Sequence, residues 1–180
     1  SIPVIAGQAK QLTVFQRTAN FSVPAHNGAL SPKFVDQIKG DYAAYREDNG
    51  QAYGGFGGRW NRYDDSVMEA SEEKRQKRFD ETWARGGFQF MSAFGDLGAS
   101  DAHNHYAAEY ARDKIRSIVN DAETAELLCP DQVIGCKRLC VDTGYFDTFN
   151  QDHVQFVNVK EHPIERITEK GLITNNTEYE

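Results

Sequence analysis

The stretch that decides the fold opens the chain: residues 1–17 read "SIPVIAGQAKQLTVFQR". Residues 1–9 have the apolar spacing of the end of a helix, and 12–17 form a run rich in β-formers. A helix, a short turn and an apolar strand are together the second half of a βαβ unit. The opening stretch therefore predicts an α/β fold.

Further along, the chain changes character twice. Helices are predicted over 32–48, after Ser31-Pro32 as N-cap and first position, after Ser71, and over 101–120 after Ser100. A short helix starts at Asp121 and ends at Cys129-Pro130. Strands return at 154–159, 164–168 and 172–174. This order predicts a helical insertion inside a nucleotide-binding sheet, with 1–31 and 134–180 in the sheet domain and 32–133 in the insertion.

Composition excludes several functional classes. The net charge of −7 argues against nucleic-acid binding and against binding to an anionic membrane, since both need a basic surface. The sequence has no apolar run long enough for a membrane span and no signal peptide, so we expect a cytoplasmic protein. The three cysteines fit no zinc pattern, and the histidines lack metal-ligand spacing, so no metal site is predicted. The Gly-rich residues 50–60 lack the GK[ST] of a P-loop and are predicted to be a loop.

Several segments together resemble one enzyme family. They are "LTVFQRTANFSVPAHN", "ETWARGGFQFM", "DAETAELLCP" and "GCKRLCVDTGYFDTFNQDHVQFVNVKEHPIERITEKGLIT". They resemble the middle of a type I Baeyer–Villiger monooxygenase of the cyclohexanone and phenylacetone monooxygenase kind. The resemblance covers essentially the whole sequence and implies part of a Rossmann-like NADP-binding domain interrupted by an all-helical insertion. It also implies the cofactors FAD and NADP, with a ketone and O2 as substrates and an ester or lactone as product.

The family's other motifs are absent from this sequence. Members carry two GxGxxG motifs, an FxGxxxHxxxW signature between them and a later ATG motif, none of which occurs here. The resemblance therefore implies that segments of the FAD domain are missing partners of this chain. We expect that the chain alone neither holds FAD nor catalyses the reaction.

Arg17 and Thr18 are predicted to bind the cofactor. In a dinucleotide fold, the end of this strand faces the ribose 2′ position, where an Arg accommodates a 2′-phosphate. The guanidinium offers a planar fork of donors, and Thr18 adds a hydroxyl. The alternative is an Arg that only ends a strand at the surface. The resemblance favours the first interpretation, because family members have an NADPH-selecting Arg in this run.

The adjacent cations Lys137 and Arg138 are predicted to have different roles. The resemblance assigns Lys137 to the same 2′-phosphate and Arg138 to the flavin face. At the flavin, a fixed cation would stabilise negative charge on oxygen and would be catalytic. Adjacent residues on an extended segment point to opposite sides, which suits two roles. Without the resemblance, a basic pair in a loop is more often structural or inert.

Two other functional hypotheses stay open at this point. A related N-hydroxylating or flavin-containing monooxygenase would share the cofactors, although its "KR" block would be expected to diverge. A stand-alone helical interaction module would have no catalysis, and the complete gene product would show no flavin absorbance.

Overall fold

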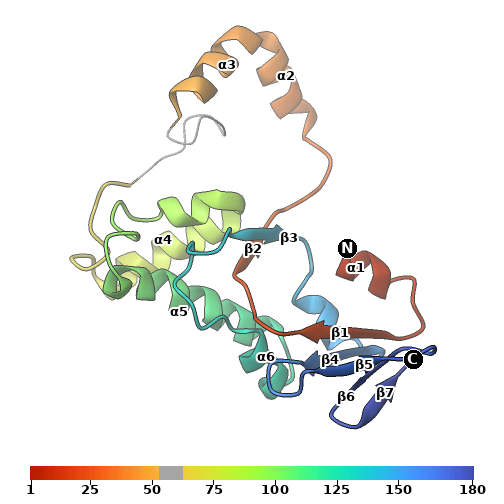
Figure 1. Ribbon diagram of the computed structural model, residues 1–180. Helices are drawn as coiled ribbons and strands as arrows, with labels where there is room; N and C mark the ends of the chain where they lie inside the picture. The colour runs from red at the N-terminus through yellow and green to blue at the C-terminus, as the bar shows by residue number, and fades with distance from the viewer. Residues whose placement is uncertain (53–62) are drawn as a thin grey trace. The chain divides into compact units, whose positions relative to one another are not determined.

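A computed structural model describes residues 1–52 and 63–180 (Figure 1). The elements in chain order are α1 (Ile2–Ala6), β1 (Leu12–Gln16), β2 (Ser22–Pro24), α2 (Pro32–Gly40), α3 (Tyr42–Gln51), α4 (Glu72–Arg85), the 3-10 helix η1 (Gly87–Ser92), α5 (Asp101–Ile118), α6 (Ala122–Leu128), β3 (Cys140–Asp142), the 3-10 helix η2 (Asp147–Asn150), β4 (Val154–Asn158), β5 (Ile164–Ile167), β6 (Leu172–Thr174) and β7 (Thr177–Tyr179). They fall into two compact units. Unit 1 contains Ser1–Ser22 and Ala107–Glu180, and unit 2 contains Val23–Tyr106.

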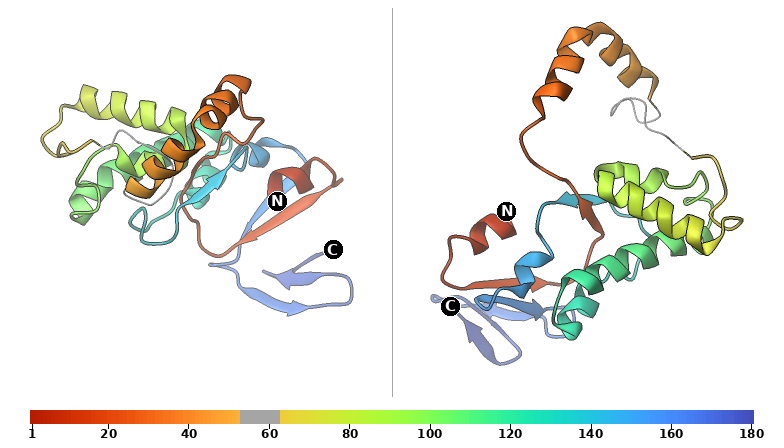
Figure 2. Two further views of the ribbon diagram at one scale, coloured as in Figure 1. Left: turned by 90° about the horizontal axis from the view of Figure 1, so that it is seen from above. Right: turned by 180° about the vertical axis from the view of Figure 1, so that it is seen from behind.

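The opening stretch folds as its pattern predicts. Helix α1 is followed by strand β1, which pairs in parallel with β4 from the far end of the sequence (Figures 1 and 2). The register places Leu12 opposite Val154 and Gln16 opposite Asn158. Parallel strands need a long crossover, and here the crossover contains most of the chain. The α/β class and the strands predicted at 12–17 and 154–159 are confirmed.

The parallel pair has one apolar face that anchors unit 1. Val14, Val154 and Phe156 pack against a buried cluster formed by the end of α5, α6 and η2. The buried members of this cluster are Ile115, Val119, Ala125, Leu128, Phe146 and Phe149. Helix α6 begins where Asp121 was predicted to start it, because the Asp121 carboxylate accepts the Thr124 N–H at 2.8 Å. The core therefore fixes the position of the β1 and β4 strands.

An antiparallel sheet, β5-β6-β7, completes unit 1. Its first two strands lie where the sequence predicts them. The third, β7, was not predicted, and it follows a tight turn in which Asn175 and Asn176 have φ of 48° and 57°. Asparagine tolerates this left-handed conformation, so the turn closes a hairpin without glycine.

In the described part of unit 2, the regular elements are helices, apart from the strand residues Val23 and Pro24. Phe79 of α4 packs against Phe90 and Phe94, with ring centroids 5.7 and 5.5 Å apart. The Ser71 hydroxyl accepts the Lys74 N–H at 3.2 Å and caps α4, which ends at Gly86 with φ 76°. The start of this helix after Ser71 agrees with the sequence.

One segment that was predicted as a single helix forms two helices. The segment 32–48 was expected to be continuous, but α2 ends at Gly40 and α3 begins at Tyr42. Asp41 lies between them with φ −146° and ψ 75°, and its carboxylate accepts the Ala44 N–H at 3.0 Å. An Asp that caps a new helix after a glycine ends the previous one.

Several further predictions can be placed on the structure. In the described residues 1–52 and 63–180, no helix is long and apolar enough to cross a membrane, and no group of three metal-ligating side chains is found. Most of the loop predicted at 50–60 lies outside the described residues. The domain boundaries at 31/32 and 133/134 stay a prediction.

Candidate functional site

The end of β1 exposes two of the predicted site residues. Gln16, the last strand residue, donates its side-chain amide to the carbonyl of Leu127 in α6 at 3.0 Å. Arg17 and Thr18 follow and are exposed, and Ala19 is buried again. The backbone is thus anchored on both sides of the exposed pair. Because the backbone is already ordered, a ligand that bound to Arg17 would have to order only its side chain.

Lys137 and Arg138 are held in a similar way. Both side chains are exposed, while Ile134 before them and Leu139 after them are 2% and 6% exposed. Gly135 has φ 91°, a conformation that glycine adopts without steric cost, and it turns the chain between the first apolar anchor and the cations. The apolar residues therefore fix the segment, and the cations face solvent.

The side chain of Asn20 joins these two segments. Its amide donates to the carbonyl of Arg138 at 3.0 Å and to the Sγ of Cys140 at 3.3 Å. A third residue, Gln132, donates its side-chain amide to the Asn20 side-chain oxygen at 3.1 Å and to the Ala19 carbonyl at 3.3 Å. The structure therefore brings the segment of Arg17 and Thr18 next to the segment of Lys137 and Arg138.

A second set of contacts continues this link along the chain. The Cys140 N–H donates to the Phe21 carbonyl at 3.0 Å, and the Ser22 hydroxyl donates to Asp142 at 2.5 Å. The other carboxylate oxygen of Asp142 accepts the Tyr145 N–H at 2.9 Å. Burial, with further contributions from Asp142 and Cys140, raises the pKa of Tyr145. These residues order the segment after the two cations.

The arrangement suits an anionic ligand. The guanidinium group of Arg17, the hydroxyl of Thr18 and the ammonium group of Lys137 come from two segments that meet beside the carboxyl end of β1. In open α/β sheets, ligands bind outside the carboxyl ends of the strands. The residues present therefore fit a phosphate of a dinucleotide. Gln132 was missed by sequence reasoning, and no local signal marks it, since its partner Asn20 is 112 residues away.

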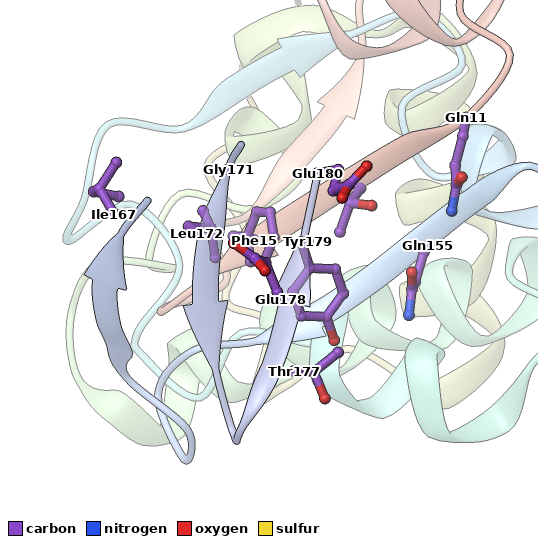
Figure 3. Close-up of a pocket in the computed structure, with 11 residues that line it drawn as sticks. Gln11, Phe15, Gln155, Ile167, Gly171, Leu172, Thr177, Glu178, Tyr179 and Glu180 are labelled. Atoms are coloured by element: carbon purple, nitrogen blue, oxygen red, sulfur yellow. The ribbon is translucent and has the colours of Figure 1, made fainter. Parts of the chain in front are cut away.

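The face of the β1 and β4 sheet that points away from the buried cluster of unit 1 lines a cavity of about 640 Å³. None of the predicted site residues lines this cavity. Thr13 and Phe15 of β1 and Gln155 of β4 line it, together with residues of β6 and β7 (Figure 3). Phe15 and Tyr179 pack edge to face there, with centroids 5.2 Å apart. Its charged lining residues are Glu178 and Glu180, which repel an anion. The cofactor phosphate is therefore not expected in this cavity.

Comparison with known proteins gives several relatives. No family model matches the chain. Phenazine N-monooxygenase PhzNO1 of Lysobacter antibioticus is 37% identical over 93% of this chain and 31% of its own length. Cyclopentanone 1,2-monooxygenase of Comamonas sp. is 36% identical over 96% of the chain and 32% of its own. A Baeyer–Villiger monooxygenase of Pseudooceanicola batsensis is 33% identical over 95% of the chain. The chain thus spans about a third of the length of the curated relatives it matches.

Solved structures agree with this result. An oxidized steroid monooxygenase bound to NADP is 40% identical, with a TM-score of 0.92 over 99% of this chain and 34% of its own. The open crystal structure of cyclohexanone monooxygenase is 36% identical and also has a TM-score of 0.92. Over nearly its whole length, this chain therefore resembles the part of a type I Baeyer–Villiger monooxygenase in which a Rossmann-like NADP-binding domain carries a helical insertion.

Proposed function

We propose that the protein carrying this chain is an FAD- and NADPH-dependent Baeyer–Villiger monooxygenase, which uses O2 to convert ketones to esters or lactones. The observation that carries the proposal is the similarity to the NADP-bound steroid monooxygenase, at 40% identity over 99% of the chain. Such likeness in sequence and backbone supports a shared cofactor as well as a shared fold. The three cysteines are free thiols, which suits a reducing cytoplasm as the place of action.

In the proposed enzyme, the site residues divide into two roles. Arg17 gives a two-pronged donor to the 2′-phosphate of NADPH, Thr18 adds a hydroxyl and Lys137 adds a point charge. Arg138 places a fixed cation where negative charge develops on oxygen during transfer to the ketone, and it is the catalytic residue of this chain. FAD, when bound, supplies the redox chemistry with O2. The amide of Asn20 holds the Arg138 carbonyl at 3.0 Å, which limits movement of that backbone.

Substrate-dependent NADPH oxidation tests the proposal. The complete gene product is purified, its visible spectrum is recorded, and NADPH consumption is followed with and without a cyclic ketone. We expect a bound flavin and faster NADPH oxidation with the ketone than with the matching alcohol, which lacks the carbonyl group. Absence of flavin, or equal rates with ketone and alcohol, would count against the proposal. Acceleration by phenazine alone would instead support N-oxygenation, the activity in the name of the Lysobacter relative.

A further inference from the structure

Two Asn-Gly dipeptides occur in the sequence, Asn27-Gly28 and Asn49-Gly50, and the proposed function uses neither of them. Asparagine is chemically labile before glycine, because glycine has no Cβ to shield its backbone nitrogen. That nitrogen can attack the side-chain carbonyl carbon of the preceding asparagine. The dipeptide therefore marks two candidate sites of spontaneous modification, and their reactivity depends on the local backbone.

The backbone around Asn49 opposes this attack. Asn49 and Gly50 lie in α3, and the Asn49 side-chain amide donates to the Tyr45 carbonyl at 3.0 Å. A helical ψ keeps the next backbone nitrogen away from the side-chain carbonyl carbon, and in a helix its N–H is bonded to the carbonyl four residues earlier. Reaction at Asn49 therefore requires local opening of α3.

The backbone around Asn27 is not helical. Residues 25–31 connect β2 to α2 without regular secondary structure, and His26, Asn27 and Gly28 are exposed. His26 has φ 48°, so the chain leaves the right-handed helical range directly before Asn27. An exposed segment outside the helices and strands can reach the reactive conformation without the opening of a helix.

From this contrast we propose that Asn27 is a site of spontaneous deamidation in the folded protein, and that α3 protects Asn49. The Gly28 nitrogen forms a bond to the side-chain carbonyl carbon of Asn27, and the bond from that carbon to the amide nitrogen breaks. The amide nitrogen takes the proton of the Gly28 N–H and leaves as ammonia. Water then opens the cyclic imide at either carbonyl and yields aspartate or isoaspartate. The reaction needs no oxidant and no cofactor, so the inference does not depend on the proposed function.

The modified residue would lie beside a close contact of unit 2. The His26 ring packs against Gly86, where a Cβ would lie 2.7 Å from the ring Cδ2 atom. Both products place a new carboxylate directly after His26, and isoaspartate also lengthens the backbone there by one carbon atom. Deamidation would thus change charge and chain length next to the residue that packs on the end of α4.

Alanine in place of each glycine gives two matched variants. A Cβ on Gly28 would approach the His26 carbonyl oxygen at 4.0 Å, and a Cβ on Gly50 would meet no atom of the described residues within 4 Å. Neither glycine has a positive φ, so both variants should fold. The added methyl group hinders attack by the nitrogen of its own residue. Gly28→Ala should therefore slow the modification of Asn27 severalfold, whereas Gly50→Ala should leave it unchanged.

Peptide mapping by mass spectrometry, after incubation of the complete gene product in mildly alkaline buffer, tests the inference. In the folded wild type, Asn27 should deamidate severalfold faster than Asn49. In urea the two sites should react at similar rates, because the unfolded chain no longer protects Asn49. Equal rates at both sites in the folded protein, faster reaction of Asn49, or an Asn27 that reacts only in urea would overturn the inference. So would an Asn27 rate that Gly28→Ala does not lower.

Discussion

At the scale of single residues, Arg17 is the group on which cofactor choice should depend most. In the proposed enzyme, Arg17→Ala should raise the KM for NADPH by about ten- to a hundredfold, because a hydrogen bond to a charged group contributes about 1.5–3 kcal/mol. The KM for NADH should hardly change. Lys10→Ala is a suitable control, since Lys10 is an exposed cation before the other end of the same strand. Equal losses for NADPH and NADH in steady-state kinetics would refute the role of Arg17.

Lys137 and Arg138 are adjacent, yet their variants should fail at different steps. Arg138→Ala should still oxidise NADPH at a measurable rate but lose oxygen transfer by about a hundred- to a thousandfold, since it removes one preorganised charge. Lys137→Ala should weaken NADPH binding and spare oxygenation once the flavin is reduced. Stopped-flow spectra separate flavin reduction from the oxygenation step. Should both variants show only the NADPH defect, Arg138 would be a second phosphate ligand and not catalytic.

The sequence indicates Arg17, Lys137 and Arg138 as candidate site residues, but it does not indicate the hydrogen bonds that hold their two segments together. Arg17 follows a strand whose composition is easily recognised, so its place at the sheet edge could be predicted. The bonds of Asn20 to Arg138 and Gln132 join residues more than a hundred positions apart. Polar side chains at such separations carry no periodic signal, and only the folded chain shows that they meet.

At the scale of elements, the end of α4 depends on two consecutive glycines with different surroundings. Gly86 has φ 76° and ψ −177°, and a Cβ there would lie 2.4 Å from the Pro24 carbonyl oxygen and 2.7 Å from the His26 ring. Gly87 has φ 65° with nothing within 4 Å of a Cβ. The backbone strain alone costs about 1–3 kcal/mol for an alanine. Gly86→Ala should therefore destabilise the fold clearly more than Gly87→Ala in urea unfolding, and equal effects would contradict the close approach.

The acid stability of unit 2 should depend on Asp65 and Asp96. Hydrogen bonds from Lys74 and Arg78 lower the pKa of Asp65. Burial raises the pKa of Asp96, but hydrogen bonds from Ser66 and Val67 and the charge of His103 outweigh it, so the pKa is lowered. With both pKa values depressed on folding, this stabilisation is complete above the unfolded value of about 4 and is lost as pH falls through the folded values.

Asp65→Asn tests this dependence, because the amide cannot titrate. Urea midpoints measured between about pH 5 and pH 2 should fall less steeply in the variant than in the wild type. Glu123→Gln, an exposed carboxyl in unit 1, serves as the control and should retain the wild-type slope. Parallel curves for wild type and Asp65→Asn would show that the Asp65 pairing contributes nothing to acid stability.

Helices whose N-cap residues are evident in the sequence were predicted more accurately than the short strands and the break between α2 and α3. Ser31, Ser71 and Asp121 accept the N–H groups that their helices expose, so sequence and structure agree on where these helices start. The break at Asp41 was missed because the apolar spacing continues through it. Strand β7 ("TEY") has polar residues at two of its three positions, unlike the more apolar β6 ("LIT"), and only its pairing with β6 defines it.

At the scale of the whole molecule, the chain order predicted the class of fold, and the structure adds a division into two compact units. The parallel pair joins residues 12–16 to 154–158, two strands that the sequence predicts, but their pairing with each other is seen only in the structure. The units divide the chain at 22/23 and 106/107, within β2 and within α5. A division inside a helix has no signal in composition, because it depends on which contacts each half of the helix makes.

The most direct test of the central claim follows the oxygen atom itself. The complete gene product is incubated with FAD, NADPH, a cyclic ketone and oxygen-18 gas, and the product is analysed by mass spectrometry. The account predicts a lactone that contains one oxygen-18 atom from O2 and retains the ketone oxygen. A ketone recovered unchanged, or a lactone without the label, would contradict it.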